Sequence, residues 1–105
     1  PYTTLFRSAW KPGLVKPIYR WIPSIAVSNF IFYQGDKFKE LNDKVIITSL
    51  KAQKLISLDF NNGKVLSEET LIEGEGRLRD VEFNSKGEIF IIGSKSGIWK
   101  LKKNN

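Results

Sequence analysis

Two arginines separated by one residue are the strongest candidates for chemistry in this sequence of 105 residues. Arg77 and Arg79 flank Leu78, and in an extended strand a spacing of two places both side chains on one face. Two planar, permanently charged guanidinium groups suit a ligand with several carboxylates, because each contact can be bidentate and charge-assisted. The alternative, which the pattern alone favours, is that both arginines pair with nearby acids such as Glu73 and Glu75.

The residues around this pair predict how it is presented. Gly74 and Gly76 indicate a turn just before the strand, where a backbone can approach a ligand closely. Asp80 is expected on the opposite face, where it could brace the backbone or a neighbouring sheet. Lys51 follows the apolar run 45–50 at the start of a loop, so its ammonium could project from the same end as Arg77. The alternative for Lys51 is an ordinary exposed turn lysine.

Composition excludes several classes of site. The sequence contains no His and no Cys, so histidine-based triads, histidine metal sites and cysteine zinc sites cannot occur in it. Its chemistry must use Lys, Arg, Asp, Glu, Tyr or a bound cofactor. We predict no catalytic residue and no metal site within these residues.

The positive charge does not predict nucleic-acid binding. The net charge is +6, but residues 41–105 carry eleven Lys or Arg against nine acids, which favours a solvated basic surface. No apolar run approaches the roughly 18 residues of a membrane span, and no secretory leader is visible. The sequence begins at Pro1 and has no Met, which favours part of a longer chain.

Short apolar and β-branched runs alternate with turn residues from Ala26 onward. The turn sequences 61–63 and 85–87 each end in Gly, which supplies the positive φ of a tight hairpin. We therefore expect an antiparallel all-β meander. The predicted strands are Val27 to Tyr33, Lys44 to Leu50, Lys54 to Phe60, Lys64 to Ile72, Leu78 to Asn84, Glu88 to Ile92 and Gly97 to Lys102.

These strands repeat. Residues 45–51 align with residues 89–95, residues 55–58 align with 98–101, and residues 28–32 align with 79–83. A period of about 40 to 50 residues with four short strands is the spacing of a β-propeller blade. We expect an irregular N-terminal segment over 1–24, of which 1–10 could be unrelated to the rest, a blade over 25–75, and an incomplete final blade over 76–105.

The order of short motifs resembles the C-terminal part of the glucose/sorbosone dehydrogenase family, which includes aldose sugar dehydrogenases that use pyrroloquinoline quinone (PQQ). The resemblance covers about residues 17–102. One residue and one segment depart from the pattern of the family: Leu41 stands where many relatives have Trp, and residues 92–96 replace a longer loop. The matching motifs are Pro23-Ser24-Ile25-Ala26 with Ser28, Phe32-Tyr33 with Gly35-Asp36, Ser49-Leu50-Lys51 with the strand 55–58, Gly76 to Val81, and Gly87 to Phe90.

The resemblance implies a six-bladed propeller, of which this chain holds about one and three-quarter blades. It also implies an enzyme that oxidises aldose sugars to lactones by hydride transfer to PQQ, with calcium ions as further cofactors. Lys51, Arg77 and Arg79 are then the residues that bind PQQ. The catalytic histidine and the calcium ligands are expected upstream, the remaining blades are the partners of this segment, and the segment alone is expected to be inactive.

Two other functions remain open. A propeller of this kind could bind sugars or proteins without being an enzyme, because fold does not fix function. A hydrolytic propeller such as a lactonase would need acidic metal ligands, and no suitable cluster is visible in the sequence. The family also implies a periplasmic or secreted location, whereas the sugar and the electron acceptor cannot be read from these residues.

Overall fold

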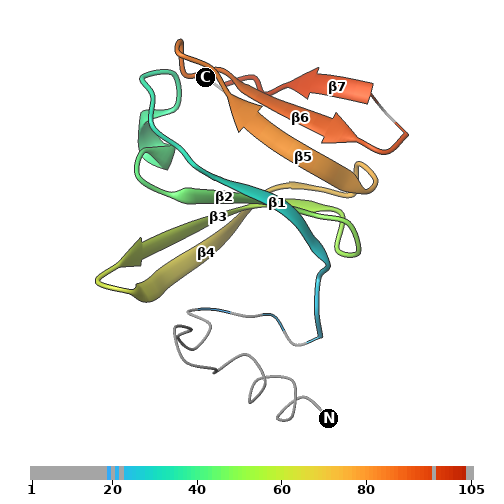
Figure 1. The fold of residues 1–105 in the computed structure, drawn as a ribbon, viewed down its shortest axis with the longest axis horizontal. Helices are drawn as coiled ribbons and strands as arrows, with labels where there is room; N and C mark the ends of the chain where they lie inside the picture. The colour runs from blue at the N-terminus through green and yellow to red at the C-terminus, as the bar shows by residue number, and fades with distance from the viewer. Residues whose placement is uncertain (1–18, 20, 22, 96, 104–105) are drawn as a thin grey trace, which may run out of the picture.

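Seven strands form two antiparallel sheets in the computed structural model, which describes residues 19, 21, 23–95 and 97–103 (Figure 1). All seven predicted strands are present, and the prediction of an all-β fold is confirmed. The first sheet has the order β1-β2-β3-β4 and the second has the order β5-β6-β7. The strands are β1 (Val27–Phe32), β2 (Val45–Ser49), β3 (Lys54–Asn61), β4 (Lys64–Glu73), β5 (Leu78–Phe83), β6 (Ile89–Gly93) and β7 (Gly97–Lys100).

The two hairpins that the sequence predicted are formed by the residues expected to form them. In the β3–β4 turn, Asn62 and Gly63 both have positive φ, 53° and 77°, which matches the twist of the flanking strands. In the β5–β6 turn, Gly87 has a φ of 78° and its N–H donates to the carbonyl of Asn84. One short 3-10 helix, η1 (Lys39–Leu41), interrupts the loop between β1 and β2 and was not predicted.

The two sheets are copies of each other in strand register. Phe30 pairs with Ile47 in the first sheet, and Val81 pairs with Ile91 in the second. The next strand repeats the match, since Ile47 pairs with Ile56 and Ile91 pairs with Trp99. These are the positions that the sequence repeat aligned, so the repeat is structural.

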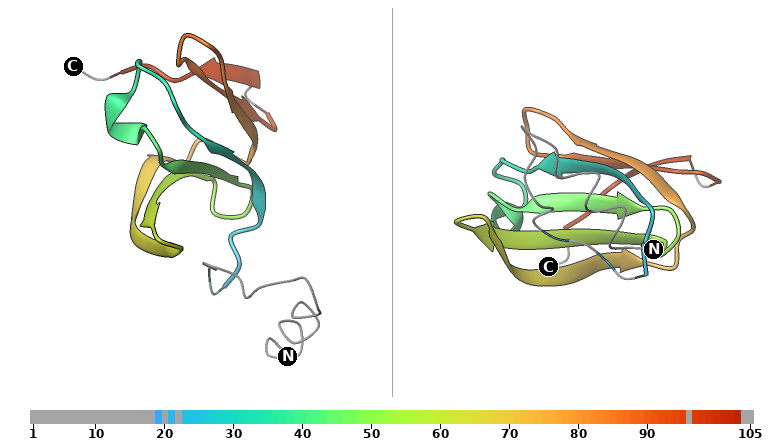
Figure 2. Two further views of the ribbon diagram at one scale, coloured as in Figure 1. Left: turned by 60° about the vertical axis from the view of Figure 1, so that its left-hand side comes forward. Right: turned by 60° about the horizontal axis from the view of Figure 1, so that its bottom comes forward.

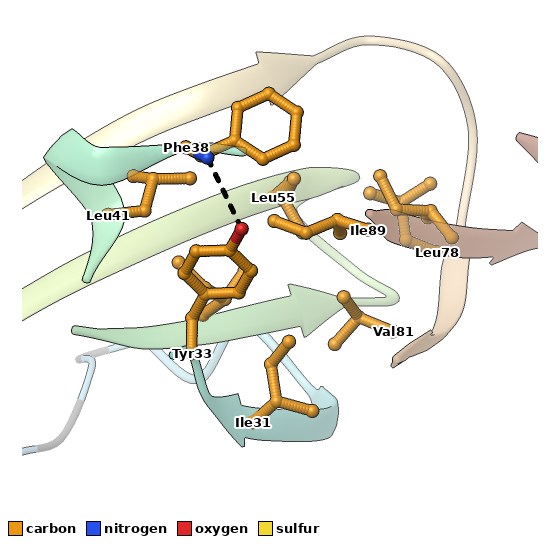
Figure 3. Packing of buried hydrophobic residues seen from close by; sticks show 10 residues of the cluster. Ile31, Tyr33, Phe38, Leu41, Leu55, Leu78, Val81 and Ile89 are labelled. Carbon is orange, nitrogen blue, oxygen red and sulfur yellow. Dashed lines mark hydrogen bonds between the residues drawn. The ribbon is translucent and has the colours of Figure 1, made fainter. Parts of the chain in front are cut away.

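The main core lies between the sheets, where the second sheet packs on one face of the first (Figures 1 and 2). Adjacent blades of a propeller pack in this way, and the prediction of consecutive propeller blades is confirmed. Leu41, where the resemblance led us to expect Trp, is 5% exposed and belongs to this core. The core consists of Ile31, Tyr33, Phe38, Leu41, Ile46, Leu55, Leu78, Val81, Ile89 and Ile91 (Figure 3).

The opposite face of the first sheet carries a second apolar cluster. It consists of Val45, Ile47, Ile56 and Leu58, with Trp21 packed against them. Strand residues alternate between the faces, which is why these side chains and the main core share the same strands. Among the described residues, no helix is long and apolar enough to cross a membrane.

Trp99 shows the effect of a sheet edge. It occupies the register position of Ile56, but it is 37% exposed whereas Ile56 is 1% exposed. Ile56 lies between two paired strands, whereas Trp99 lies in β7, which pairs with β6 alone among the described strands. Trp99 therefore lies at an exposed edge of the second sheet, whereas its counterpart Ile56 is buried.

Most of the segment 1–24 lies outside the described residues. This includes residues 1–10, which the sequence analysis suggested could be unrelated to the rest. Of the described part, Tyr19, Trp21, Pro23 and Ser24 belong to no strand. Tyr19 and Trp21 each donate a hydrogen bond to Glu68 on β4, at 2.7 Å and 3.1 Å, so this part of the segment lies against the first sheet.

Candidate functional site

Arg77 and Arg79 lie at the beginning of β5, on either side of a buried residue. Leu78 is 4% exposed and sits in the core between the sheets, whereas both arginines are exposed. Leu78 pairs with Gly93 and Asp80 pairs with Ile92, so Arg79 is an extra residue in a β-bulge. The shared face predicted for the two arginines assumed regular alternation, and the bulge removes that assumption. The role of the pair in binding a cofactor stays a prediction.

The acids that could have neutralised the pair do not do so within the described residues. Glu73 instead approaches Lys54, with 3.9 Å between the ammonium nitrogen and a carboxylate oxygen. Glu75 is exposed in the loop before Arg77. In this part of the chain, no carboxylate lies within ion-pair distance of either guanidinium group. Both positive charges therefore remain open to a ligand.

Lys51 lies at the same end of the two sheets. It is exposed in the β2–β3 turn, and its backbone N–H donates to the carbonyl of Ile25 at 3.1 Å. The N–H of Gly74 in the loop before Arg77 donates to the carbonyl of Gln53 in the same turn, also at 3.1 Å. This contact joins the Lys51 turn to the loop that leads to β5, and Figure 1 shows both on one side of the molecule.

Ala26, which follows the residue that accepts the Lys51 N–H, has a strained backbone conformation. Ala26 has a φ of 57°, in the left-handed region that costs an L-residue about 1–2 kcal/mol. Its carbonyl accepts the N–H of Leu50 at 2.8 Å, and its N–H donates to Ser24 Oγ at 3.1 Å. Beside it, Lys51 lines a hollow of about 400 Å³ whose other walls include Trp21 and Pro23. Strain of this kind persists only where the surroundings hold it in place.

Side chains of the first sheet hold the backbone on both sides of Arg79. Before Arg79, the carbonyl of Leu78 accepts a hydrogen bond from Ser28 Oγ at 2.7 Å. After it, the carbonyl of Val81 accepts one from Asn29 Nδ2 at 3.2 Å. β1 and β5 lie side by side, which makes these contacts possible although the residues are about fifty positions apart in sequence (Figure 1).

Asp80 completes this set of contacts. One of its carboxylate oxygens, Oδ1, accepts the second N–H of the Asn29 side chain and the backbone N–H of Val81, the latter at 2.8 Å. Asp80 thus braces both its own backbone and the neighbouring sheet, the two roles considered for it from the sequence. Ser28 is further supported by Thr48, with 2.8 Å between their hydroxyl oxygens. We call Ser28, Asn29, Thr48 and Asp80 the inter-sheet network.

Sequence reasoning did not identify Ser28, Asn29 or Thr48 as part of the site. The available signal was the repeat, which aligns Ser28 with Arg79 and Asn29 with Asp80. In the structure Ser28 is also the extra residue of a bulge, because Val27 pairs with Ser49 and Asn29 pairs with Thr48. The two bulges therefore occupy the same position in successive sheets.

The other end of the sheets is joined by a buried tyrosine. Tyr33 is 0% exposed; its hydroxyl donates to the carbonyl of Gly87 and accepts the N–H of Phe38 at 3.3 Å (Figure 3). Burial raises the pKa of this phenol above its usual value. An added Cβ at Gly35 would lie 2.7 Å from the Cα of Gly87, so the two loops touch through their backbones. This end is close-packed, in contrast to the exposed cationic end.

The exposed positive charges of this candidate site suit an anionic ligand. Among the described residues, no three acidic side chains are grouped closely enough to hold a metal ion. The Lys51 ammonium and the two guanidinium groups supply hydrogen-bond donors and positive charge at this end of the sheets. A planar anion with several carboxylates fits this donor set better than a neutral sugar does.

The sequence is similar to a known protein family and to two curated proteins. The sequence matches the glucose/sorbosone dehydrogenase family over residues 3–100. It is 32% identical over 91 residues to the aldose sugar dehydrogenase YliI of Escherichia coli K12, which covers 86% of this chain and 24% of that protein. It is also 30% identical over 84 residues to a protein of Synechocystis, covering 78% of this chain and 20% of that one.

The fold is also similar to solved structures of glucose dehydrogenases. One glucose dehydrogenase superposes with a TM-score of 0.80 at 26% identity, covering 90% of this chain and 29% of that one. A second glucose dehydrogenase gives a TM-score of 0.75 at 28% identity, covering 90% and 28%. The chain thus spans less than a third of the length of these relatives. Because the family match extends over nearly the whole sequence, this chain belongs to the glucose/sorbosone dehydrogenase family.

Proposed function

We propose that these two sheets belong to a sugar dehydrogenase that oxidises aldoses to lactones with PQQ as its cofactor. The proposal draws on the membership of the family and on relatives described as aldose sugar and glucose dehydrogenases. When bound, PQQ supplies the acceptor for the hydride that leaves the sugar. The part assigned to this chain is to bind and orient that cofactor.

Three cations carry this role: Lys51, Arg77 and Arg79. PQQ is a tricarboxylate, and the guanidinium groups can each donate two parallel hydrogen bonds to a carboxylate. Lys51 adds a compact positive charge at the same end of the sheets.

One observation supports the proposal above the others. Both arginines are exposed at the beginning of β5, and no carboxylate within the described residues is in ion-pair distance of either. A purely structural pair of arginines would be expected to lie against acids such as Glu73, which is used by Lys54 instead. Two unneutralised charges so close in sequence favour an anionic ligand.

Other parts of the protein must supply the rest of the reaction. The sequence contains no His, so a histidine base would have to come from other blades, together with the calcium ligands. On this basis we propose that residues 1–105 alone are inactive as a dehydrogenase. A periplasmic or secreted location is part of the same proposal, because it follows from the family alone.

The test uses the full protein that carries these residues. PQQ is titrated with and without calcium, and oxidation of a panel of aldoses is then followed with an electron-accepting dye. We expect saturable PQQ binding and PQQ-dependent oxidation. A folded, calcium-loaded protein with no PQQ-dependent activity would contradict the proposal and favour a propeller that only binds.

Within this test, Arg79→Ala is expected to weaken PQQ binding by about 1.5–3 kcal/mol, the range for hydrogen bonds to charged groups. The matched control is Lys86→Ala, which removes an exposed cation from the β5–β6 turn at the other end of the sheet. The control should leave PQQ affinity unchanged. Equal affinities for Arg79→Ala and the unmodified protein would refute the role given to Arg79.

A further inference from the structure

The exposed arginines of β5 are flanked by backbone atoms that the neighbouring sheet holds. Ser28 Oγ reaches the carbonyl of Leu78 across 2.7 Å, and the amide of Asn29 reaches the carbonyl of Val81 across 3.2 Å. Arg79 lies between these two anchored residues. Its own side chain is exposed and has no ion-pair partner among the described residues, so its position depends on the backbone beneath it.

A bulge needs such support more than a regular strand does. The extra residue of a bulge is not paired in the strand ladder, and the ladder is locally disrupted around it. Arg79 is that residue, between the pairs Leu78 with Gly93 and Asp80 with Ile92. The carbonyl of Arg77 is also held, by the N–H of Ser94 at 2.9 Å. The hydrogen bonds from Ser28 and Asn29 therefore hold the carbonyls of Leu78 and Val81 on the two sides of the bulge.

The donors of the network are fully used. Ser28 and Thr48 carry one hydroxyl proton each, so both are satisfied when Thr48 donates to Ser28 and Ser28 donates to the carbonyl of Leu78. The two N–H groups of the Asn29 amide go to Asp80 and to the carbonyl of Val81. No buried polar side-chain atom among the described residues is left without a partner. A fully satisfied network of this kind fixes a single geometry.

We propose that Ser28 and Asn29, acting with Asp80, are positioning residues that hold Arg77 and Arg79 in the geometry needed to bind PQQ. This inference rests on the proposed function, since it assigns these residues to the same cofactor site. Its content is distinct, because the residues that set the arginine geometry belong to the preceding sheet and touch no ligand themselves. Correct packing of the two sheets is then a condition for cofactor binding.

The test compares variants of the full protein that each lose one inter-sheet contact. Ser28→Ala and Asn29→Ala remove donors next to the arginines, and Ser28→Thr keeps the hydroxyl. Tyr33→Phe is the matched control, because it removes an inter-sheet hydrogen bond at the opposite end, to the carbonyl of Gly87. PQQ affinity is measured by titration well below the unfolding temperature of each variant, so that loss of folding does not enter.

We expect Ser28→Ala and Asn29→Ala to weaken PQQ binding about fivefold, which corresponds to one hydrogen bond. Ser28→Thr should restore most of the affinity, and Tyr33→Phe should change it less than about twofold even where it lowers stability more. A second readout needs no ligand. Hydrogen exchange of the backbone from 77 to 81 should be faster in Ser28→Ala and Asn29→Ala, and unchanged in Tyr33→Phe.

The outcomes separate the two proposals. If Arg79→Ala weakens PQQ binding but Ser28→Ala and Asn29→Ala behave like Tyr33→Phe, the positioning role is overturned and the cofactor role stands. If Arg79→Ala has no effect on PQQ affinity, the cofactor role is wrong and this inference fails with it. If Asn29→Ala does not fold, the comparison of Ser28→Ala with Ser28→Thr still decides the question.

Discussion

Replacing Tyr33 by Phe removes a single oxygen from the junction between the two sheets. The hydroxyl donates to the carbonyl of Gly87 and accepts the N–H of Phe38, and the residue is fully buried. Phenylalanine keeps the ring and its edge contacts with Phe38 and Phe83, whose ring centroids lie 6.2 Å and 5.2 Å away, so no cavity forms beyond the lost oxygen. The change therefore isolates the two hydrogen bonds.

The cost follows from the groups left behind. A buried polar group without a partner costs about 1–3 kcal/mol. The N–H of Phe38 contributes at the low end, because its bond to the hydroxyl is long at 3.3 Å. The carbonyl of Gly87 contributes more, because it loses the shorter contact. We expect a total loss of about 2 kcal/mol in the free energy of unfolding.

Urea denaturation of the full protein, followed by tryptophan fluorescence, measures this loss. Tyr19→Phe is the control, because the hydroxyl of Tyr19 bonds an exposed carboxylate of Glu68 at 2.7 Å. Loss of a surface hydrogen bond is expected to change stability by less than about 0.5 kcal/mol. A Tyr33→Phe variant as stable as the Tyr19→Phe control would show that this hydroxyl does not join the sheets.

Three further predictions concern the loops and turns around the sheets. Gly35→Ala should destabilise the protein more than Tyr33→Phe does, because the new Cβ would lie 2.7 Å from the Cα of Gly87; a urea midpoint equal to that of the unmodified protein would contradict the close contact. Ala26→Gly should raise the free energy of unfolding by about 1 kcal/mol by relieving a φ of 57°, and a lower urea midpoint would disprove the strain. Hydrogen bonds from the side chains of Asn84 and Lys100 lower the pKa of Glu88. The ionised carboxylate therefore stabilises the folded protein above the usual glutamate pKa, and this stabilisation is lost as the pH falls through the lowered pKa. Melting temperatures of Glu88→Gln should therefore vary less with pH between about pH 5 and pH 3 than those of the unmodified protein, and parallel curves would contradict this.

The sequence was enough to predict the seven strands and the repeat that relates the two sheets. Most strands are short runs rich in β-branched or aromatic residues, and the turns 61–63 and 85–87 end in Gly, so these local patterns are kept in the fold. The repeat added long-range information, because it aligned Ile47 with Ile91 and Ile56 with Trp99 before any sheet was known. The structure agrees with these alignments, because Ile47 pairs with Ile56 in the first sheet just as Ile91 pairs with Trp99 in the second.

The sequence was not enough to predict the bulges. Nothing in the residue types around Ser28 or Arg79 distinguishes an extra residue from a regular strand position, since both are polar in either case. A bulge is decided by the pairing of two strands and by the neighbouring sheet, which local pattern does not contain. For this reason the sequence analysis expected regular alternation of Arg77, Leu78 and Arg79 and did not include the bulge at Arg79.

The hydrogen-bond partner of Asp80 also could not be predicted from the local sequence. An acid after an arginine predicts an ion pair as readily as a structural contact. The structure resolves the choice, because Asn29 approaches from β1 and takes the carboxylate. That partner is 51 residues away in sequence, and only the repeat hinted at the relationship.

The central claim is that Arg77 and Arg79 hold PQQ, and a crystal structure of the full protein with PQQ and calcium tests it most directly. We predict that each guanidinium group lies about 2.7–3.2 Å from oxygen atoms of the cofactor, with the bulge at Arg79 retained. The claim is contradicted if PQQ binds elsewhere while both arginines are bonded to carboxylates of other blades.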